Sequence, residues 1–339
     1  MKKNIITFYI KSLLLCLPFI MSVGWYMIED PFMVVRHYKD YDHSHFIQDE
    51  SAIGWFKYKN QRDSMHYDAF LMGNSNTKGI RCADWNAYIK ARPFRLFSNA
   101  EGLGDLCLKL DALDHRPSQP VRHLLIVCDH AFFEKIDPRN GFKNVMPPEI
   151  TGNSWISFQT TFMQSFFTPK FIIAYLKYSL TGKYDKSMNC IINQNIPTRT
   201  LLTNDQIISE EDSIRLQGAR YWQKAQWASI YDQPKAYEAP IIEEQQFRLL
   251  HHIQNFCQRH NTHLMIVITP TYHKPAMAKS DIEKLESIFP PHTVFDFSSN
   301  SNYKQAEDFY DGIHFTQATG RRMLKEMYHE SPKGMLSTK

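Results

Sequence analysis

The chain has 339 residues, of which 43% are hydrophobic and 14% aromatic, and its formal net charge is +4. That length is enough for one large domain or two, and the composition suits a globular protein with a sizeable core. The small net charge supplies no basic face or stripe, so we expect no nucleic-acid partner. The six cysteines form no CxxC pair of the metal or redox type, and we expect most of them to be small buried side chains.

The first apolar stretch of the chain, Ile5–Met27, is long enough to cross a bilayer. It ends with Trp25 and Tyr26, residues typical of a membrane–water interface, and no small-residue cleavage site follows it. We therefore interpret residues 1–29 as a retained membrane anchor, with a cleaved signal segment as the alternative. The two lysines before the stretch predict a cytoplasmic N-terminus. The rest of the chain would then lie in the periplasm or outside the cell, held to the cell membrane by a single span.

We interpret residues 30–66 as an exposed juxtamembrane segment. Histidine and aspartate side chains, both of which can bind metal ions, gather near its middle. These residues are His37, Asp40, Asp42, His43 and His45. Their spacing matches no structural zinc pattern, so we favour an exposed segment, with a metal site as the alternative.

From residue 67 to about residue 330 the sequence alternates between strand and helix patterns. Apolar runs typical of buried parallel strands occupy residues 69–72, 94–97, 123–129, 263–269 and 293–296. Helical patterns occupy residues 84–89, 105–113, 241–259, 282–288 and 317–328. Five strands separated by helices predict an α/β domain over residues 67–330, with a doubly wound and mainly parallel sheet.

The alternation stops between about residues 130 and 240. This stretch is rich in aromatic side chains that we expect to be exposed, namely Phe158, Phe162, Phe166, Phe167, Phe171, Tyr175, Tyr178, Tyr221, Trp222 and Trp227. Long excursions in compact domains are often lids or binding loops. We interpret the stretch as an insertion that covers or borders the site, with an irregular structural excursion as the alternative. Exposed aromatics would suit stacking on sugars and a protein interface equally well.

A candidate nucleophile follows the first predicted strand, in the sequence Gly73-Asn74-Ser75. At the carboxyl end of a strand in an open α/β sheet, the Ser75 hydroxyl would point into the crevice where such sheets bind ligands. Free N–H groups of the turn and of the following helix start could face a developing oxyanion. The alternative is an ordinary strand-to-helix turn in which Ser75 or Asn74 is only a helix N-cap.

The second candidate group is the stretch Asp311-Gly-Ile-His314, in a loop before the last predicted helix. Asp311 and His314 are three residues apart, so one turn lets the carboxylate accept the imidazole Nδ1–H. The Nε2 atom is then free to take a proton from a serine. Because His314 follows the last predicted strand, we expect it at the same end of the sheet as Ser75.

This combination of a strand-end G-x-S and a late D-x-x-H resembles the SGNH/GDSL hydrolase superfamily. It is most similar to the membrane-anchored, exported members associated with acyl groups on polysaccharides. The resemblance covers about residues 67–129 and 263–328, and it implies a flavodoxin-like three-layer α/β/α fold. It also implies that Ser75 is the nucleophile, His314 the general base and Asp311 the acid that orients His314.

The resemblance further implies an oxyanion hole near the end of the second predicted strand. The backbone N–H of Ser75 and that of Gly102 would supply donors, and Gly104 is the nearby rival of Gly102. Asn99 begins the same turn and is a further candidate donor. Such donors act by stabilising the negative charge that develops on the ester oxygen in the transition state.

The chain departs from the family pattern in three respects, one of which is that the signature around Ser75 is short and lacks further matching residues. Asn74 stands where the family usually has an aspartate, and Asp129 stands where an asparagine donor normally follows the middle strand. An ionised Asp129 cannot donate a hydrogen bond, so it would oppose an oxyanion. His130, the next residue, could donate in its place, and we count Asp129 and His130 as auxiliary candidates.

We therefore expect an exported, membrane-anchored serine esterase or O-acyltransferase that needs no metal or cofactor. Its substrate would be an acylated glycan, acetyl esters foremost, or a small ester, and a lipid ester is a third possibility. The alternative is a catalytically weak or inactive SGNH-like protein that serves as a binding or assembly component of an envelope polysaccharide system. The aspartate at position 129, where the family normally has an asparagine donor, favours that alternative.

Overall fold

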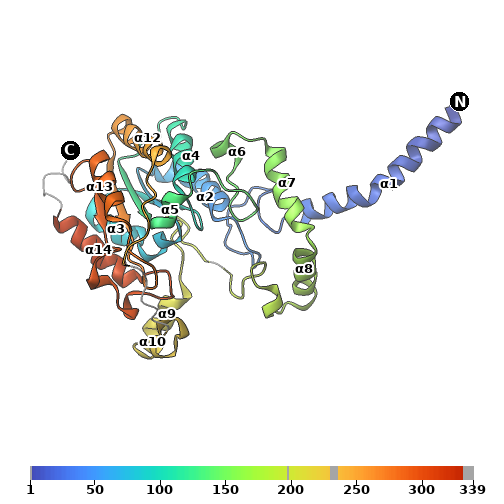
Figure 1. Cartoon of the computed structure of the whole chain (residues 1–339). Coiled ribbons are helices and arrows are strands. Elements are labelled where there is room, and N and C mark those ends of the chain that lie inside the picture. Colours follow the sequence, from blue (N-terminus) through green and yellow to red (C-terminus); the bar gives the residue numbers. More distant parts are fainter. Residues whose placement is uncertain (1, 197, 230–235, 331–339) are drawn as a thin grey trace.

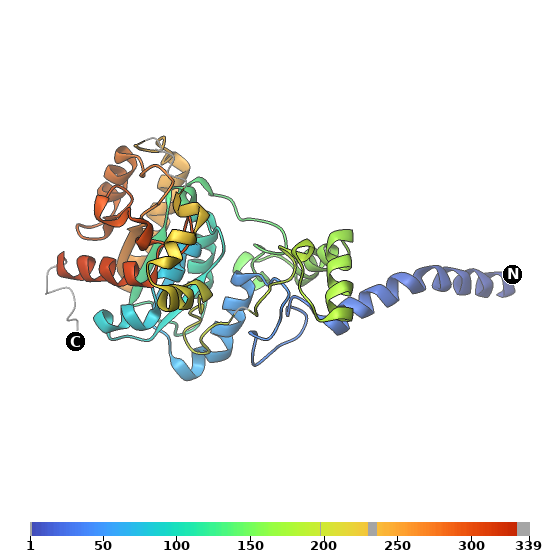
Figure 2. The same ribbon diagram turned by 90° about the horizontal axis from the view of Figure 1, so that it is seen from below.

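The computed structural model describes residues 2–196, 198–229 and 236–330 (Figure 1), so two short parts of the predicted insertion lie outside it. Helix α1 (Lys2–Glu29) projects alone from one end of the body, as Figures 1 and 2 show. Within the described ranges, its portion Ile5–Glu29 is the one helix that is long and apolar enough to cross a membrane, and an 18-residue window in it has a mean hydropathy of 1.9. The predicted N-terminal apolar helix is therefore present.

Five strands form one sheet in which every neighbouring pair is parallel. They are β1 (Ala69–Gly73), β2 (Pro93–Phe97), β3 (His123–Cys128), β4 (His263–Ile268) and β5 (Val294–Asp296). Their order in the sheet is β2-β1-β3-β4-β5. The predicted α/β class and parallel sheet are confirmed. Because the strands are parallel, their carboxyl ends meet at one edge, where Asn74 and Asp129 follow β1 and β3.

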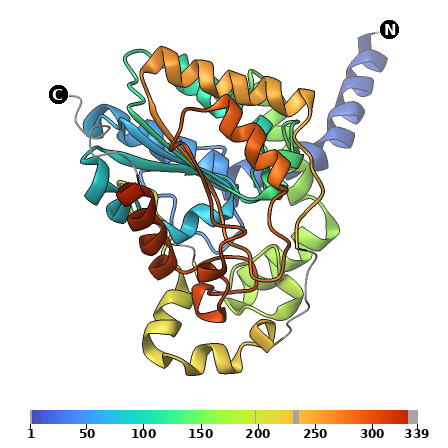
Figure 3. The ribbon, with the colours of Figure 1, turned by 60° about the vertical axis from the view of Figure 1, so that its left-hand side comes forward.

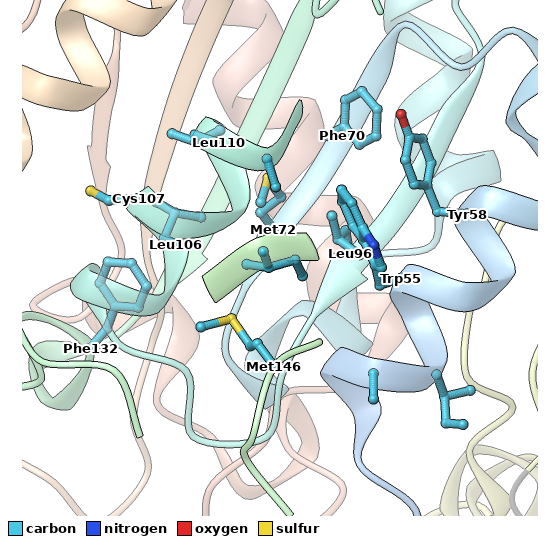
Figure 4. Close-up of a cluster of buried hydrophobic side chains, with 14 of the residues drawn as sticks. Trp55, Tyr58, Phe70, Met72, Leu96, Leu106, Cys107, Leu110, Phe132 and Met146 are labelled. Carbon is cyan, nitrogen blue, oxygen red and sulfur yellow. The ribbon is translucent and has the colours of Figure 1, made fainter. Parts of the chain in front are cut away.

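Helices cover both faces of the sheet. Alternate strand residues point to opposite faces, and the strands are apolar at both sets of positions, so both faces must be buried. On β1, Phe70 and Met72 belong to one hydrophobic cluster, part of which Figure 4 shows, whereas Ala69 and Leu71 belong to a second. The helices over the first cluster are α2 (Glu50–Met65), α4 (Leu103–Asp114), α12 (Glu244–His260) and α13 (Lys279–Ile288). Those over the second are α3 (Cys82–Ile89) and α14 (Gln317–Glu330). In Figure 3 the orange α12 and the dark red α14 lie on opposite sides of the strands.

The segment between α1 and the sheet is folded into the body, so the prediction of an exposed segment over residues 30–66 is wrong. Phe32 and Tyr41 are fully buried, and α2 packs against β2. The carboxylate of Asp42 pairs with Lys57 (2.7 Å) and Arg199 (2.5 Å), so side-chain cations neutralise it. The apolar and aromatic residues of this segment complete the core, which overrides the polar appearance of its histidine-rich part.

Asp49 caps the N-terminus of α2 and is fully buried. Its carboxylate accepts the backbone N–H groups of Ser51 (2.8 Å) and Ala52 (3.0 Å). In the described part of the chain, the second carboxylate oxygen is buried without a hydrogen-bond partner. Burial of the charge is the largest effect on this group, and it raises the pKa of Asp49 to about 7.

We expect the free energy of unfolding to fall as the pH rises from about 5 to about 8, because folded Asp49 holds a proton that the unfolded chain has lost. With the pKa raised from 3.8 to about 7, the loss over this pH range is on the order of 2–3 kcal/mol, because the free energy of unfolding changes only up to the pKa of the folded state. Asp49→Asn keeps a capping oxygen without the charge, so it should remove most of this fall. Denaturant titration of the full chain in detergent at both pH values measures it. An equal fall in the wild type and in Asp49→Asn would contradict the prediction.

The insertion contains α5 (His130–Glu134), α6 (Pro148–Thr151), α7 (Trp155–Phe166), α8 (Pro169–Thr181), α9 (Ser209–Gln217), α10 (Arg220–Lys224) and α11 (Gln226–Ser229). Short 3-10 helices are η1 (Ser75–Gly79), η2 (Lys186–Met188), η3 (Ser301–Tyr303) and η4 (Ala306–Asp308). In Figure 1, α7 and α8 lie at the base of α1, whereas α9 and α10 lie elsewhere on the body. Five of the ten aromatic side chains expected to be exposed are buried in the core, and the other five are only partly exposed, so that expectation is wrong. The buried ones are Phe158, Phe162, Phe166, Phe171 and Tyr175.

Candidate active site

Ser75 lies at the carboxyl end of β1, where the chain turns into the 3-10 helix η1. Gly73 makes this turn possible, because its φ of +127° is a conformation that other residues rarely adopt. A Cβ at Gly73 would also lie 2.0 Å from the carbonyl oxygen of Val127 on β3. Asn74 then caps η1 by accepting the N–H of Asn76 through its side chain (3.0 Å). These local constraints hold the half-buried Ser75 at the sheet edge.

The D-x-x-H loop is closed by its own backbone. Phe309 and Phe315 form an antiparallel bridge, and the Tyr310 N–H donates to the carbonyl oxygen of His314 (3.0 Å). Inside this loop the Asp311 carboxylate accepts the backbone N–H of His314 (2.7 Å). The backbone of the loop therefore holds the Asp311 carboxylate in place independently of its contact with the imidazole.

Helix α14 follows this loop and packs against η1, which places the loop beside Ser75. Gly320 in α14 approaches η1 so closely that a Cβ there would lie 2.0 Å from the carbonyl oxygen of Gly79. His314 Nδ1 lies 2.8 Å from Asp311 Oδ2, and His314 Nε2 lies 2.8 Å from Ser75 Oγ. With the proton on Nδ1, the ring donates to Asp311 and accepts from the Ser75 hydroxyl. The structure thus brings together Ser75, His314 and Asp311, the three residues predicted to act together.

The charge on Asp311 is favoured by its neighbour. Burial alone would raise the pKa of Asp311, but the hydrogen bonds and the charge of His314 outweigh burial and lower the pKa below its ordinary value. The carboxylate is therefore ionised throughout the neutral range. The Tyr310 ring stacks on the imidazole with the ring planes 6° apart and the centroids 5.5 Å apart, so it limits the rotation of His314.

Two of the predicted oxyanion donors are engaged elsewhere. The N–H of Gly102 points to the carboxylate of Asp105 (3.4 Å), and the N–H of Gly104 donates to the carbonyl oxygen of Lys135 (3.1 Å). Asn99 is exposed and lies in the turn that follows β2. The N–H of Ser75 is the first of η1 and therefore has no acceptor within that helix. Of the predicted donors, the Ser75 N–H is the one that must lie beside the Ser75 hydroxyl, because both groups belong to the same residue.

Asn74 and Asp129, two of the departures from the pattern of the family that the sequence resembles, contact each other. The Asn74 side-chain amide donates to Asp129 Oδ1 (2.9 Å), and both residues are buried. Asp129 Oδ2 lies 3.6 Å from Lys274 Nζ. The amide and the carboxylate expected at these two positions are thus both present, with their places exchanged. Asp129 holds the turn that presents Ser75, and this contact could not be inferred from either residue alone.

His130 does not contact the triad. Its Nε2 atom lies 3.1 Å from the carbonyl oxygen of Ala239, and its Nδ1 atom lies 3.7 Å from Glu134. His130 and Asp129 instead line a cavity of about 210 Å³ at the carboxyl ends of β3 and β4, which none of the three triad residues lines. The structure therefore gives no support to His130 as an oxyanion donor, because its ring nitrogens face the insertion.

The insertion borders the D-x-x-H loop, as one of the two interpretations of the sequence predicted. From α10, the Tyr221 hydroxyl donates to the carbonyl oxygen of Tyr310, and the Trp222 Nε1–H donates to that of Phe309 (2.8 Å). In α9, Glu211 accepts the N–H of Gln317 at the start of α14 (2.6 Å). These contacts were missed at the sequence level. The aromatic content of the insertion was the available signal, but it could not show which aromatics reach the loop.

The described residues contain no group of three or more His, Cys, Asp or Glu side chains that could hold a metal ion. All six cysteines are unpaired, and Cys82, Cys107, Cys128 and Cys257 are buried, as expected for most of them. Comparisons of the chain with protein-family models, with curated proteins and with solved structures found no match. The functional interpretation consequently depends on the arrangement of Ser75, His314 and Asp311.

Proposed function

We propose that this protein is a membrane-anchored, exported serine esterase or O-acyltransferase of the SGNH/GDSL type, acting on acyl esters of a glycan. The observation that carries the proposal is the continuous contact Ser75–His314–Asp311, with both side-chain distances at 2.8 Å. The strand order β2-β1-β3-β4-β5, with helices on both faces, supports the flavodoxin-like three-layer fold that the proposal includes.

The proposed reaction has two steps. Ser75 Oγ attacks the ester carbonyl while His314 Nε2 takes the hydroxyl proton, and the ester C–O bond breaks as His314 returns that proton to the departing alcohol. Water or a sugar hydroxyl then attacks the acyl-enzyme and loses its proton to His314, and the bond from the acyl carbon to Ser75 Oγ breaks as His314 returns that proton to Oγ. The ionised Asp311 keeps the imidazole in the tautomer that this transfer needs.

The location part of the proposal depends on α1. Its length and composition suit a single span, although a signal sequence would meet the same criterion. With α1 retained, the N-terminus would be cytoplasmic and the α/β domain would lie in the periplasm or outside the cell. A glycan substrate fits that location. The triad lies outside the cavity beside Asp129, and Ser75, Asp311 and His314 are each partly exposed.

A second function is favoured by one observation. The N–H groups of Gly102 and Gly104 are engaged with Asp105 and Lys135, which leaves the oxyanion hole with few donors. Loss of one donor typically lowers a rate by about 10²–10³-fold. The second candidate is therefore a catalytically weak or inactive SGNH-like protein that binds acylated glycan, or that serves in the assembly of an envelope polysaccharide system.

A fluorophosphonate probe separates the two functions, because it reacts covalently only with an activated serine. We expect the full chain in detergent to be labelled and Ser75→Ala to lose the label. The matched control is Ser299→Ala, since the Ser299 hydroxyl donates to the carboxylate of Asp296 (2.8 Å) and not to an imidazole. That variant should be labelled like the wild type. Absence of labelling in the folded wild type would favour the binding function.

A further inference from the structure

Helix α8 is apolar on two faces, which is unusual for a helix at the surface of a domain. Phe171 and Tyr175 are buried against the core. Ile173, Leu176 and Leu180 are 64%, 42% and 84% exposed, and their spacing places them together on the outer face. Apolar side chains grouped on an exposed helix face commonly mark an interaction surface.

The start of α7 extends this surface, and contacts with α1 fix its position. Trp155 and Ile156 are 46% and 80% exposed. The Trp25 ring near the end of α1 meets the Phe166 ring of α7 edge-on, with centroids 5.0 Å apart. The Tyr26 hydroxyl and the Gln159 side-chain oxygen of α7 are 3.2 Å apart. Helices α7 and α8 are thus fixed at the base of α1, as Figures 1 and 2 show.

The charge of the same stretch has one sign. Residues 155–184 contain Lys170, Lys177 and Lys183 and no aspartate or glutamate. Lys170 and Lys183 are exposed, and Lys177 pairs with Asp185 just beyond the stretch. Lysines beside an exposed apolar face are typical of helices that lie in the headgroup region of an anionic bilayer. Both the apolar face and the charge therefore suit a lipid surface.

We propose that Trp155, Ile156, Ile173, Leu176 and Leu180, which we call the α7–α8 platform, lie in the headgroup region of the bilayer that α1 crosses. This inference rests on the proposed role of α1 as a membrane span. The platform gives the domain a second attachment to the membrane, so that the body cannot swing freely about α1. The triad would then be held at a fixed height and orientation above the lipid surface.

A depth measurement on the full chain tests the platform. An environment-sensitive fluorophore is attached to Ile173→Cys, in a background where the exposed Cys16 and Cys190 are replaced by serine. Leu216→Cys in α9, 76% exposed, is the matched control, and Met21→Cys in α1, 65% exposed, reports on the span. The proteins are reconstituted in phosphatidylcholine nanodiscs with and without phosphatidylglycerol, and quencher-bearing lipids are added. We expect quenching at positions 21 and 173 and none at position 216.

A second variant tests the charge. Replacing Lys170, Lys177 and Lys183 by glutamine should reduce quenching at position 173 in discs with phosphatidylglycerol. For each lysine removed, we expect the equilibrium constant between the membrane-bound and the free platform to fall by about fivefold. Quenching at position 21 without quenching at position 173 would overturn the platform and leave the anchor intact. Absence of quenching at both positions would overturn the anchor and the platform together. A blue-shifted but unquenched probe at position 173 would show that protein covers it, which also overturns the proposal.

Discussion

Replacing Ser75 by alanine is expected to lower the rate of ester hydrolysis by at least about 10³-fold, and adding His314→Ala should cost almost nothing more. The reason is that the two side chains act as one unit: without the Ser75 hydroxyl, the imidazole has no proton to accept. The measurement is the hydrolysis of a chromogenic acetyl ester by the full chain in detergent. Equal unfolding midpoints of the variants and the wild type would show that folding is unchanged.

Asp311→Asn gives the matched test of the third residue. An amide at this position can donate to Nδ1 and favour the wrong imidazole tautomer, so we expect a loss of about 10⁴-fold in turnover with little change in KM. Because the pKa of Asp311 is held below its ordinary value, protonation of Asp311 should not limit the wild-type rate at neutral pH. Rates of Ser75→Ala or Asp311→Asn within a few-fold of the wild type would rule out the triad as the source of activity.

The elements that the sequence predicted best are those decided by local patterning. The strand expected at residues 263–269 is observed as β4 (His263–Ile268), because a continuous apolar run suits a parallel strand buried on both faces. The pairing of Asp311 with His314 was also accessible, since three residues of separation place both on one turn. Their proximity to Ser75 followed from the rule that parallel strands gather a site at their carboxyl ends.

The features that the sequence could not show depend on contacts between distant segments. Residues 30–66 look polar around His37–His45, but the segment is folded in by apolar residues such as Phe32 and by the ion pair of Asp42 with Arg199 in the insertion. The insertion has little regular patterning, so its contacts with Tyr310 came from tertiary packing alone. Likewise, the sequence shows Asn74 and Asp129 only as two separate departures from the family pattern, whereas the structure places them in contact.

That contact predicts an asymmetric response to substitution. Asn74→Asp puts two buried carboxylates where the amide and the carboxylate now lie 2.9 Å apart. The repulsion should cost on the order of 2–4 kcal/mol of unfolding free energy and distort the turn that holds Ser75. Asp129→Asn should be milder, because the oxygen of an asparagine at that position can still accept from Asn74.

The double variant Asn74→Asp/Asp129→Asn is the decisive protein in this series. An amide at position 129 would donate to a carboxylate at position 74, which would still accept the N–H of Asn76 as the cap of η1. We therefore expect the double variant to recover most of the stability and ester hydrolysis that Asn74→Asp loses at about pH 8. Lowering the pH should also partly rescue Asn74→Asp, since one proton shared by the two carboxyls removes the repulsion. A double variant no better than Asn74→Asp would mean that the two residues act independently, and Asp129 would then have to be explained by its contact with Lys274 and the cavity.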